Sequence, residues 1–104
     1  MEKTARILPH NLEVEQSVLG CLFLSQDAQS ECFAKMQASD FYSTGHQKIF
    51  RAMYENYRSN KGVDYVTVAK TLDTKGEIED VGGIEYIADL TNAVPSESNY
   101  KNYM

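Results

Sequence analysis

The chain has 104 residues, enough for one domain with a single modest core. Hydrophobic residues make up 42% and charged residues 24%, a balance that excludes an intrinsically disordered protein. No apolar run approaches the ~20 residues that span a bilayer, and residues 1–6 lack the apolar core of a secretory signal. We therefore expect a cytoplasmic protein with no membrane partner, in which residues 1–8 form a flexible lead-in.

The net charge of −5 belongs to the second part of the chain. Residues 1–62 hold seven acidic and seven basic residues, whereas residues 63–104 hold eight acidic and three basic residues. DNA-binding proteins obtain much of their affinity from Lys and Arg at phosphates. The acidic second part argues against a nucleic-acid reader and indicates a basic partner.

Helical periodicity recurs along the chain and alternating strand patterns do not persist, which predicts an all-α compact bundle of about six short helices. The first helix follows the N-cap Asn11 and runs to Leu24, with Leu12 and either Glu15 or Gln16 on its inward face. Asp27 is expected to cap a shorter second helix that points three apolar residues inward. These are Cys32, Phe33 and Met36.

The clearest helix signal begins at Thr44, because residues 44–47 have capping-box spacing and apolar residues then repeat at three- and four-residue steps. Gly62 is expected to end this helix in a left-handed cap. The repeating residues are Ile49, Phe50, Met53, Tyr54 and Tyr57.

Two further helices follow. Asp64 is expected to cap one that closes before Gly76, with a strand over residues 66–68 as the alternative. Gly82-Gly83 opens the next, which Pro95 stops. The inward residues are Tyr65, Val68, Ala69 and Leu72 in the first, and Ile84, Ile87, Leu90 and Val94 in the second.

A last helix is expected from Glu97 to Met104. It has no stop signal, which suggests that the sequence was cut from a longer chain. The inward stripes of all these helices define the predicted core. Its main members are Leu19, Phe23, Ile49, Phe50, Met53, Leu72, Ile87 and Leu90.

Nothing in the sequence has the pattern of a catalytic, cofactor or metal site. No glycine is followed by the Lys-Ser or Lys-Thr of a phosphate-binding loop. Cys21 and Cys32 are expected to be reduced packing residues, and His10 and His46 to pack or cap. We therefore predict no catalytic residue, no cofactor and no metal in this chain.

A helix-turn-helix over residues 65–72 and 84–90 is the main DNA-binding alternative. Its connecting turn is longer than the three to four residues of that motif. The second helix would present Glu85 and Asp89 to the groove, where carboxylates repel phosphates.

Residues 9–20 (PHNLEVEQSVLG) place an acidic-x-acidic-Gln before an apolar stretch that ends in Gly. This block resembles the opening signature of the amino-terminal domain of DnaB-type bacterial replicative DNA helicases. Later blocks follow in order, and together they cover about residues 9–103. They are DFY at 40–42, HQKIF at 46–50, DYVTVA at 64–69, GGIEYI at 82–87 and AVPS at 93–96.

The resemblance implies that residues 1–104 are the globular head of a longer protein. In that family a helical hairpin, a linker and a RecA-like ATPase domain follow, and ATP and Mg²⁺ belong to the ATPase domain. The family forms a hexameric ring, with its amino-terminal domains in a trimer of dimers, and unwinds DNA at the replication fork. Primase and the helicase loader are the implied partners, and DNA contacts fall to the rest of the protein.

We therefore expect an assembly and partner-docking domain; a freestanding helical DNA-binding regulator is the alternative. The predicted docking surface is acidic, with an aromatic ring at its edge, a combination that protein interfaces favour. It comprises Glu77, Glu79, Asp80, Glu85, Tyr86 and Asp89.

Overall fold

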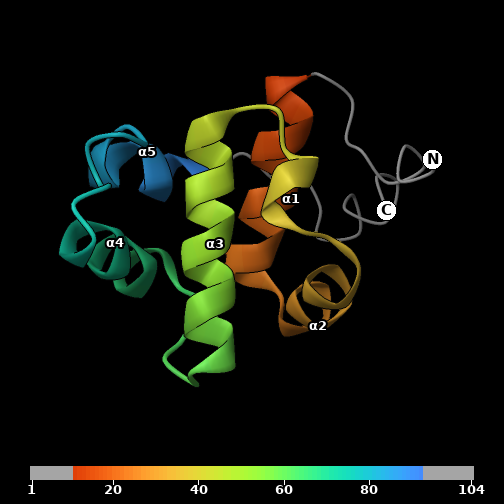
Figure 1. Ribbon diagram of the computed structural model, residues 1–104. Helices are drawn as coiled ribbons and strands as arrows, with labels where there is room; N and C mark the ends of the chain where they lie inside the picture. The colour runs from red at the N-terminus through yellow and green to blue at the C-terminus, as the bar shows by residue number, and fades with distance from the viewer. Residues whose placement is uncertain (1–10, 93–104) are drawn as a thin grey trace.

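The computed structural model of the chain describes residues 11–92, which fold into five α-helices and one short 3₁₀ helix (Figure 1). No strand occurs among these residues, so the all-α prediction is confirmed and the strand alternative at residues 66–68 is wrong. The sixth predicted helix, with Val94, lies outside the described residues. The elements are α1 (Leu12–Leu24), α2 (Gln26–Lys35), η2 (Ala38–Asp40), α3 (Thr44–Arg58), α4 (Tyr65–Thr74) and α5 (Gly83–Leu90).

The longest helix, α3, runs through the middle of the bundle. Helices α1 and α2 lie on one side of it and α4 and α5 on the other (Figure 1). α5 packs against both α4 and α1, and thereby closes the bundle across the start of α3. Segments far apart in sequence are thus brought together at that end.

Polar side chains determine where the helices begin. The predicted caps are confirmed for α1, where Asn11 accepts from the backbone N–H of Glu13, and for α4, where Asp64 accepts from that of Thr67. The caps predicted for α2 and α3, at Asp27 and Thr44, lie one or two residues after the actual caps. Ser25 caps α2 and Ser43 caps α3.

The reason is the same for both misplaced caps: each serine has extended backbone directly before the helix and turns its hydroxyl to the third amide. Because α1 ends at Leu24, Ser25 is the whole connection, and Asp27 falls in the first turn of α2. There its carboxylate still faces the positive end of the helix dipole.

The end of α3 also differs from the prediction. The helix stops at Arg58, and Asn60, not Gly62, takes the left-handed conformation that follows, with φ of 61°. Asparagine tolerates this region better than most residues. The N–H of Lys61 then bonds to the carbonyl of Asn56, and Gly62, which also has a positive φ of 107°, follows in the connection to α4.

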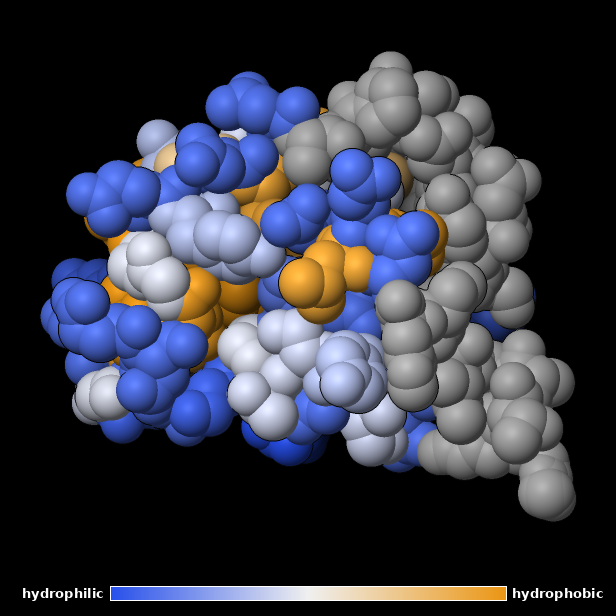
Figure 2. All heavy atoms as spheres, turned by 90° about the horizontal axis from the view of Figure 1, so that it is seen from above, coloured by the Kyte–Doolittle hydropathy of each residue, from blue (hydrophilic) through white to orange (hydrophobic). Residues whose placement is uncertain are grey.

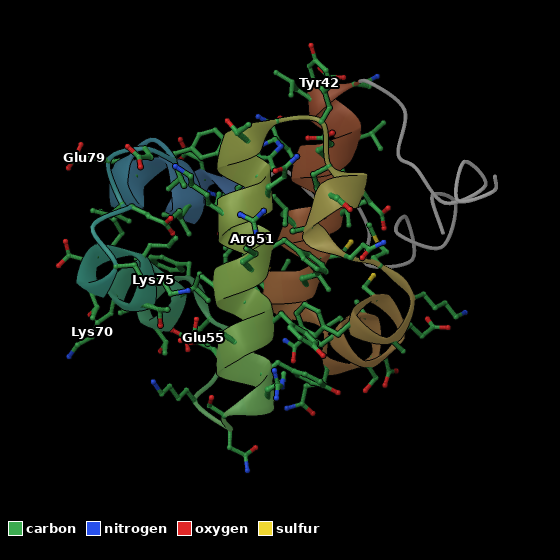
Figure 3. All side chains as sticks on the ribbon, in the orientation of Figure 1. Tyr42, Arg51, Glu55, Lys70, Lys75 and Glu79 are labelled. Carbon is green, nitrogen blue, oxygen red and sulfur yellow. The ribbon has the colours of Figure 1, made fainter. Side chains whose placement is uncertain are left out.

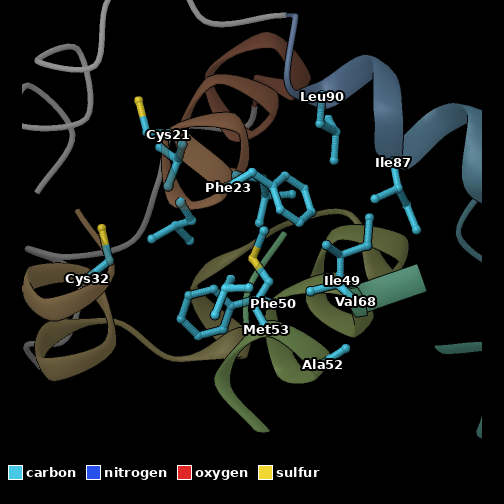
Figure 4. Close-up of a cluster of buried hydrophobic side chains, with 14 of the residues drawn as sticks. Cys21, Phe23, Cys32, Ile49, Phe50, Ala52, Met53, Val68, Ile87 and Leu90 are labelled. Carbon is cyan, nitrogen blue, oxygen red and sulfur yellow. The ribbon is translucent and has the colours of Figure 1, made fainter. Parts of the chain in front are cut away.

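A single core joins the helices (Figure 4). Met53 is fully buried at the centre, and both cysteines are buried among apolar side chains. Burial raises the pKa of the Cys32 thiol to about 12, because the interior disfavours the thiolate. All eight residues expected in the core are buried: Leu19, Phe23, Ile49, Phe50, Met53, Leu72, Ile87 and Leu90.

Five residues that were expected to face inward are exposed instead: Leu12, Tyr54, Tyr57, Tyr65 and Ile84. Polar and charged residues cover most of the face seen in Figure 2, and apolar atoms reach the surface there in separate patches. None of the described helices has the length and apolar character needed to cross a membrane.

Candidate functional site

The predicted acidic surface is formed by the loop before α5 and by the outer face of that helix. Glu79 and Asp80 are exposed in the loop, whereas Glu77 is half-buried. Glu85 and Asp89 are exposed on α5, four residues apart and so on one face of the helix. Four of the five predicted carboxylates are therefore exposed, on α5 and in the loop before it.

One of these carboxylates has a basic neighbour. Lys48 Nζ, on the solvent side of α3, lies 3.0 Å from Asp80 Oδ2. Glu79 has no such partner among the described residues, and its side chain extends away from the bundle (Figure 3). Glu79, Glu85 and Asp89 are therefore the carboxylates most available to a partner.

The apolar group beside these carboxylates is not the expected one. The sequence placed Ile84 in the core and Tyr86 at the edge of the acidic surface. In the structure Ile84 is 45% exposed, whereas Tyr86 is partly buried and packs against the core. α5 is rotated relative to the prediction because the Tyr86 hydroxyl finds polar partners inside the bundle.

Those partners form a chain of hydrogen bonds across three helices. His46 Nε2, on α3, lies 2.6 Å from the Tyr86 hydroxyl, and His46 Nδ1 lies 2.7 Å from Glu15 Oε1 on α1. Gln16 Nε2 donates to the Tyr86 hydroxyl over 3.1 Å. The roles match if Nδ1 donates to an ionised Glu15 and Nε2 accepts from Tyr86.

Glu15 also holds the start of α3. Its Oε2 accepts from the backbone N–H of Tyr42 at 2.6 Å, and its Oε1 accepts from that of Ser43 at 3.3 Å. The side chain is fully buried. A buried carboxylate is tolerated when several donors surround it, and here the donors come from the turn before α3 and from His46.

A carboxylate, an imidazole and a hydroxyl joined in series also occur in the active sites of hydrolases. We therefore asked whether Glu15, His46 and Tyr86 could form a catalytic site. Glu15 is 0% exposed and His46 is 2% exposed, which leaves no room for a substrate at the imidazole. The terminal hydroxyl is a phenol held by two neighbours. The arrangement joins α1, α3 and α5 structurally, and spacing along the sequence gave no sign of it.

The turn into α5 depends on two glycines. Gly82 has φ of 108° and Gly83 has φ of 79°, both in the region that side chains disfavour. A Cβ on Gly82 would lie 2.8 Å from Tyr86 Cβ. The predicted turn at Gly82-Gly83 is thus confirmed, and it allows Tyr86 to approach the backbone closely.

The described residues contain no group of three or more His, Cys, Asp or Glu side chains placed to hold a metal ion. The helix-turn-helix alternative also finds no support between residues 65 and 90. Residues 75–82 form a long connection between α4 and α5, and the exposed face of α5 carries carboxylates.

Comparisons with known proteins point to one family. A family model described as the DnaB-like helicase N terminal domain matches residues 7–104. The replicative DNA helicase DnaB of Treponema pallidum (strain Nichols) is 39% identical over 102 residues, which cover 98% of this chain and 23% of that protein. The replicative DNA helicase DnaC of Bacillus subtilis (strain 168) is 40% identical over 98 residues, covering 94% and 22% respectively.

A solved structure gives the same result for the fold. The crystal structure of the N-terminal domain of DnaB helicase from Mycobacterium tuberculosis is similar with a TM-score of 0.85 and 36% sequence identity. The similarity covers 92% of this chain and 67% of that chain. The chain spans about a quarter of the length of the two curated relatives.

Proposed function

Because the chain belongs to the DnaB-like helicase N-terminal domain family, we propose that it is the assembly and partner-docking domain of a hexameric replicative DNA helicase. In this proposal the unwinding motor, with its ATP and Mg²⁺, lies in another domain of the same protein. Primase and the helicase loader are the proposed partners. The family match over nearly the whole chain is the observation that carries the proposal.

The acidic surface is the proposed docking site within this domain. Glu79, Glu85 and Asp89 offer carboxylates to a basic partner, and the half-exposed Ile84, on the same helix as Glu85 and Asp89, adds an apolar group. Tyr86 supports this surface by fixing the rotation of α5 through its bond to His46. Glu77 and Asp80 contribute to the same negative field, although Asp80 is partly compensated by Lys48.

Charge reversal on α5 tests this proposal in the full-length helicase. Glu85→Lys should slow association with primase or loader, and the effect should shrink as salt rises, because electrostatic steering acts mainly on the association rate. Glu13→Lys is the matched control, since Glu13 is also an exposed glutamate in the first turn of a helix. Both changes therefore carry a similar cost at the helix dipole.

Association kinetics measured at two salt concentrations, with ring assembly followed by sedimentation, give the readout. If both variants bind primase and loader as the unaltered helicase does, the acidic surface is only a solvated face. If both variants lose ring assembly alike, the effect is structural and does not belong to docking.

A further inference from the structure

A hollow lies between α2, η2 and α3, and none of its lining residues belongs to the hydrogen-bonded group of Glu15, His46 and Tyr86. It has a volume of about 210 Å³. Its walls are mostly apolar: Phe33, Met36, Ala38, Phe50 and Tyr54, with Arg51 at the rim. An apolar cavity of about 150 Å³ accommodates benzene, so this hollow has space for one large apolar side chain.

Aromatic packing gives the hollow fixed walls. The ring of Phe33 lies 5.3 Å from that of Phe50 and 5.6 Å from that of Tyr54, with tilted planes in both pairs. Tilted aromatic pairs at such distances are favourable contacts. The hollow is therefore lined by side chains that hold one another in place.

Arginines border the hollow on its solvent side. Arg51 and Tyr54 line both this hollow and a neighbouring one that also includes Arg58. The Arg58 guanidinium lies 5.7 Å above the Tyr54 ring, where the cation and the aromatic face attract each other. Arg51 lies on the same side of α3 as Glu55 (Figure 3).

Glu55, the carboxylate on this side of α3, already has a cationic partner in Lys75. Lys75 reaches from α4 to Glu55, and this hydrogen bond lowers the pKa of the Glu55 carboxyl (Figure 3). No ion pair involves Arg51 or Arg58 among the described residues. Arg51 at the apolar hollow and Arg58 over the adjoining Tyr54 ring are therefore two cations with no ion-pair partner in the part of the chain that the structure describes.

We propose that this hollow and its two arginines, which we call the arginine groove, bind an acidic peptide segment of another protein through one apolar anchor side chain. The anchor occupies the hollow that Phe33, Phe50 and Tyr54 line together with Met36 and Ala38. Carboxylates that flank it pair with Arg51 and Arg58, whose planar guanidinium groups suit such contacts. This surface is separate from the acidic surface on α5, and it takes a partner of the opposite charge.

The composition of the groove favours a peptide over a nucleic acid. Phosphate binding would require several cations in a row, whereas Lys75 is paired with Glu55, and only Arg51 at the hollow and Arg58 in the neighbouring one remain. The deep part of the site is lined by aliphatic and aromatic side chains that enclose an apolar group. A single anchor in such a pocket, with charges around it, is the usual design of a protein interface.

Binding of a labelled peptide to the 104-residue chain tests the proposal. The probe is a fluorescein-labelled peptide with one phenylalanine between two runs of three aspartates, followed by fluorescence anisotropy. Arg51→Glu should weaken binding about tenfold, a loss of about 1.4 kcal/mol. Lys70→Glu is the matched control, because it makes the same charge change at an exposed position on α4 outside the groove, and should alter binding less than about twofold.

Two altered peptides separate the apolar and the charged contributions. Replacing the phenylalanine by serine should weaken binding about tenfold, and replacing the aspartates by asparagines should remove most of its salt dependence. Thermal unfolding of each variant verifies that the fold is kept. Equal loss with Lys70→Glu, equal binding of the serine peptide, or tighter binding of single-stranded oligothymidylate would each overturn the proposal.

Discussion

Tyr86 stacks on His46 with the two rings 5.9 Å apart and nearly parallel, and its hydroxyl lies 2.6 Å from His46 Nε2. The contact joins α5 to α3, and the two residues are forty positions apart along the chain. It turns the polar edge of Tyr86 into the bundle and leaves Ile84 at the surface. Together with the burial of Ile87 and Leu90, this pair determines which face of α5 is exposed.

Removal of the Tyr86 hydroxyl should therefore destabilise the domain. In Tyr86→Phe the ring still stacks, but His46 and Gln16 lose a partner, which should cost about 1–3 kcal/mol because a buried polar group is left unsatisfied. Urea unfolding measures the change. Tyr65→Phe removes a hydroxyl from a tyrosine that is 38% exposed and should cost less than about 0.5 kcal/mol; a similar loss in both would contradict the role given to the His46 contact.

Glu15→Gln should be more damaging than its conservative appearance suggests. The carboxylate accepts three hydrogen bonds, from Tyr42, Ser43 and His46, and a glutamine oxygen cannot replace both carboxylate oxygens. The expected loss is about 2–4 kcal/mol in urea unfolding, because charged hydrogen bonds in the interior are strong.

The neighbouring glutamate supplies the comparison for this change. Glu13 is exposed in the first turn of α1, so Glu13→Gln should lose only about 0.3–1 kcal/mol of helix-dipole interaction. Equal losses at the two positions would mean that Glu15 acts only through the helix dipole.

Gly82→Ala, in the turn into α5, should destabilise the domain more than Gly76→Ala, just after α4. Both glycines have positive φ, so each substitution costs about 1–2 kcal/mol of backbone strain. Only at Gly82 does the new Cβ meet another side chain, 2.8 Å from Tyr86 Cβ, whereas nothing lies within 4 Å at Gly76. Thermal unfolding of the two variants should differ by several degrees; identical transitions would show that the close approach of Tyr86 is not maintained.

The Cys32 thiol should make stability fall at alkaline pH. Its pKa is raised from 9.0 to about 12 by burial, so the unfolded chain loses this proton above pH 9 while the folded chain keeps it. The stabilisation that comes from keeping Cys32 protonated in the folded chain is fully present below pH 9 and is lost as the pH rises towards 12. At pH 10 the loss should be on the order of 1 kcal/mol.

Comparison with Cys32→Ala isolates this effect from other titrating groups. Urea unfolding at pH 8 and pH 10 gives the free energy of unfolding for both proteins. The advantage of the unaltered chain should shrink between the two pH values. If the difference between the proteins stays constant, the thiol titrates alike in the folded and unfolded chains.

The sequence alone determined the helices and the core of this protein. Caps such as Asn11 and Asp64 act on amides two or three residues away, and inward stripes such as that of Ile49 and Met53 repeat with the period of one helix. Such interactions are local and can be read from spacing. The two misplaced caps, at Ser25 and Ser43, differ from the prediction by one or two residues, because adjacent polar residues compete for the same amides.

Only the tertiary structure decided how the polar residues pair. Glu15, His46 and Tyr86 are thirty-one and forty residues apart along the chain, and no spacing rule links them. The rotation of α5 follows from that pairing, because a buried hydroxyl needs a partner more than Ile84 needs burial. The arginine groove arises in the same way: α2, η2 and α3 place Phe33, Ala38 and Arg51 around one hollow, which depends on how the helices pack.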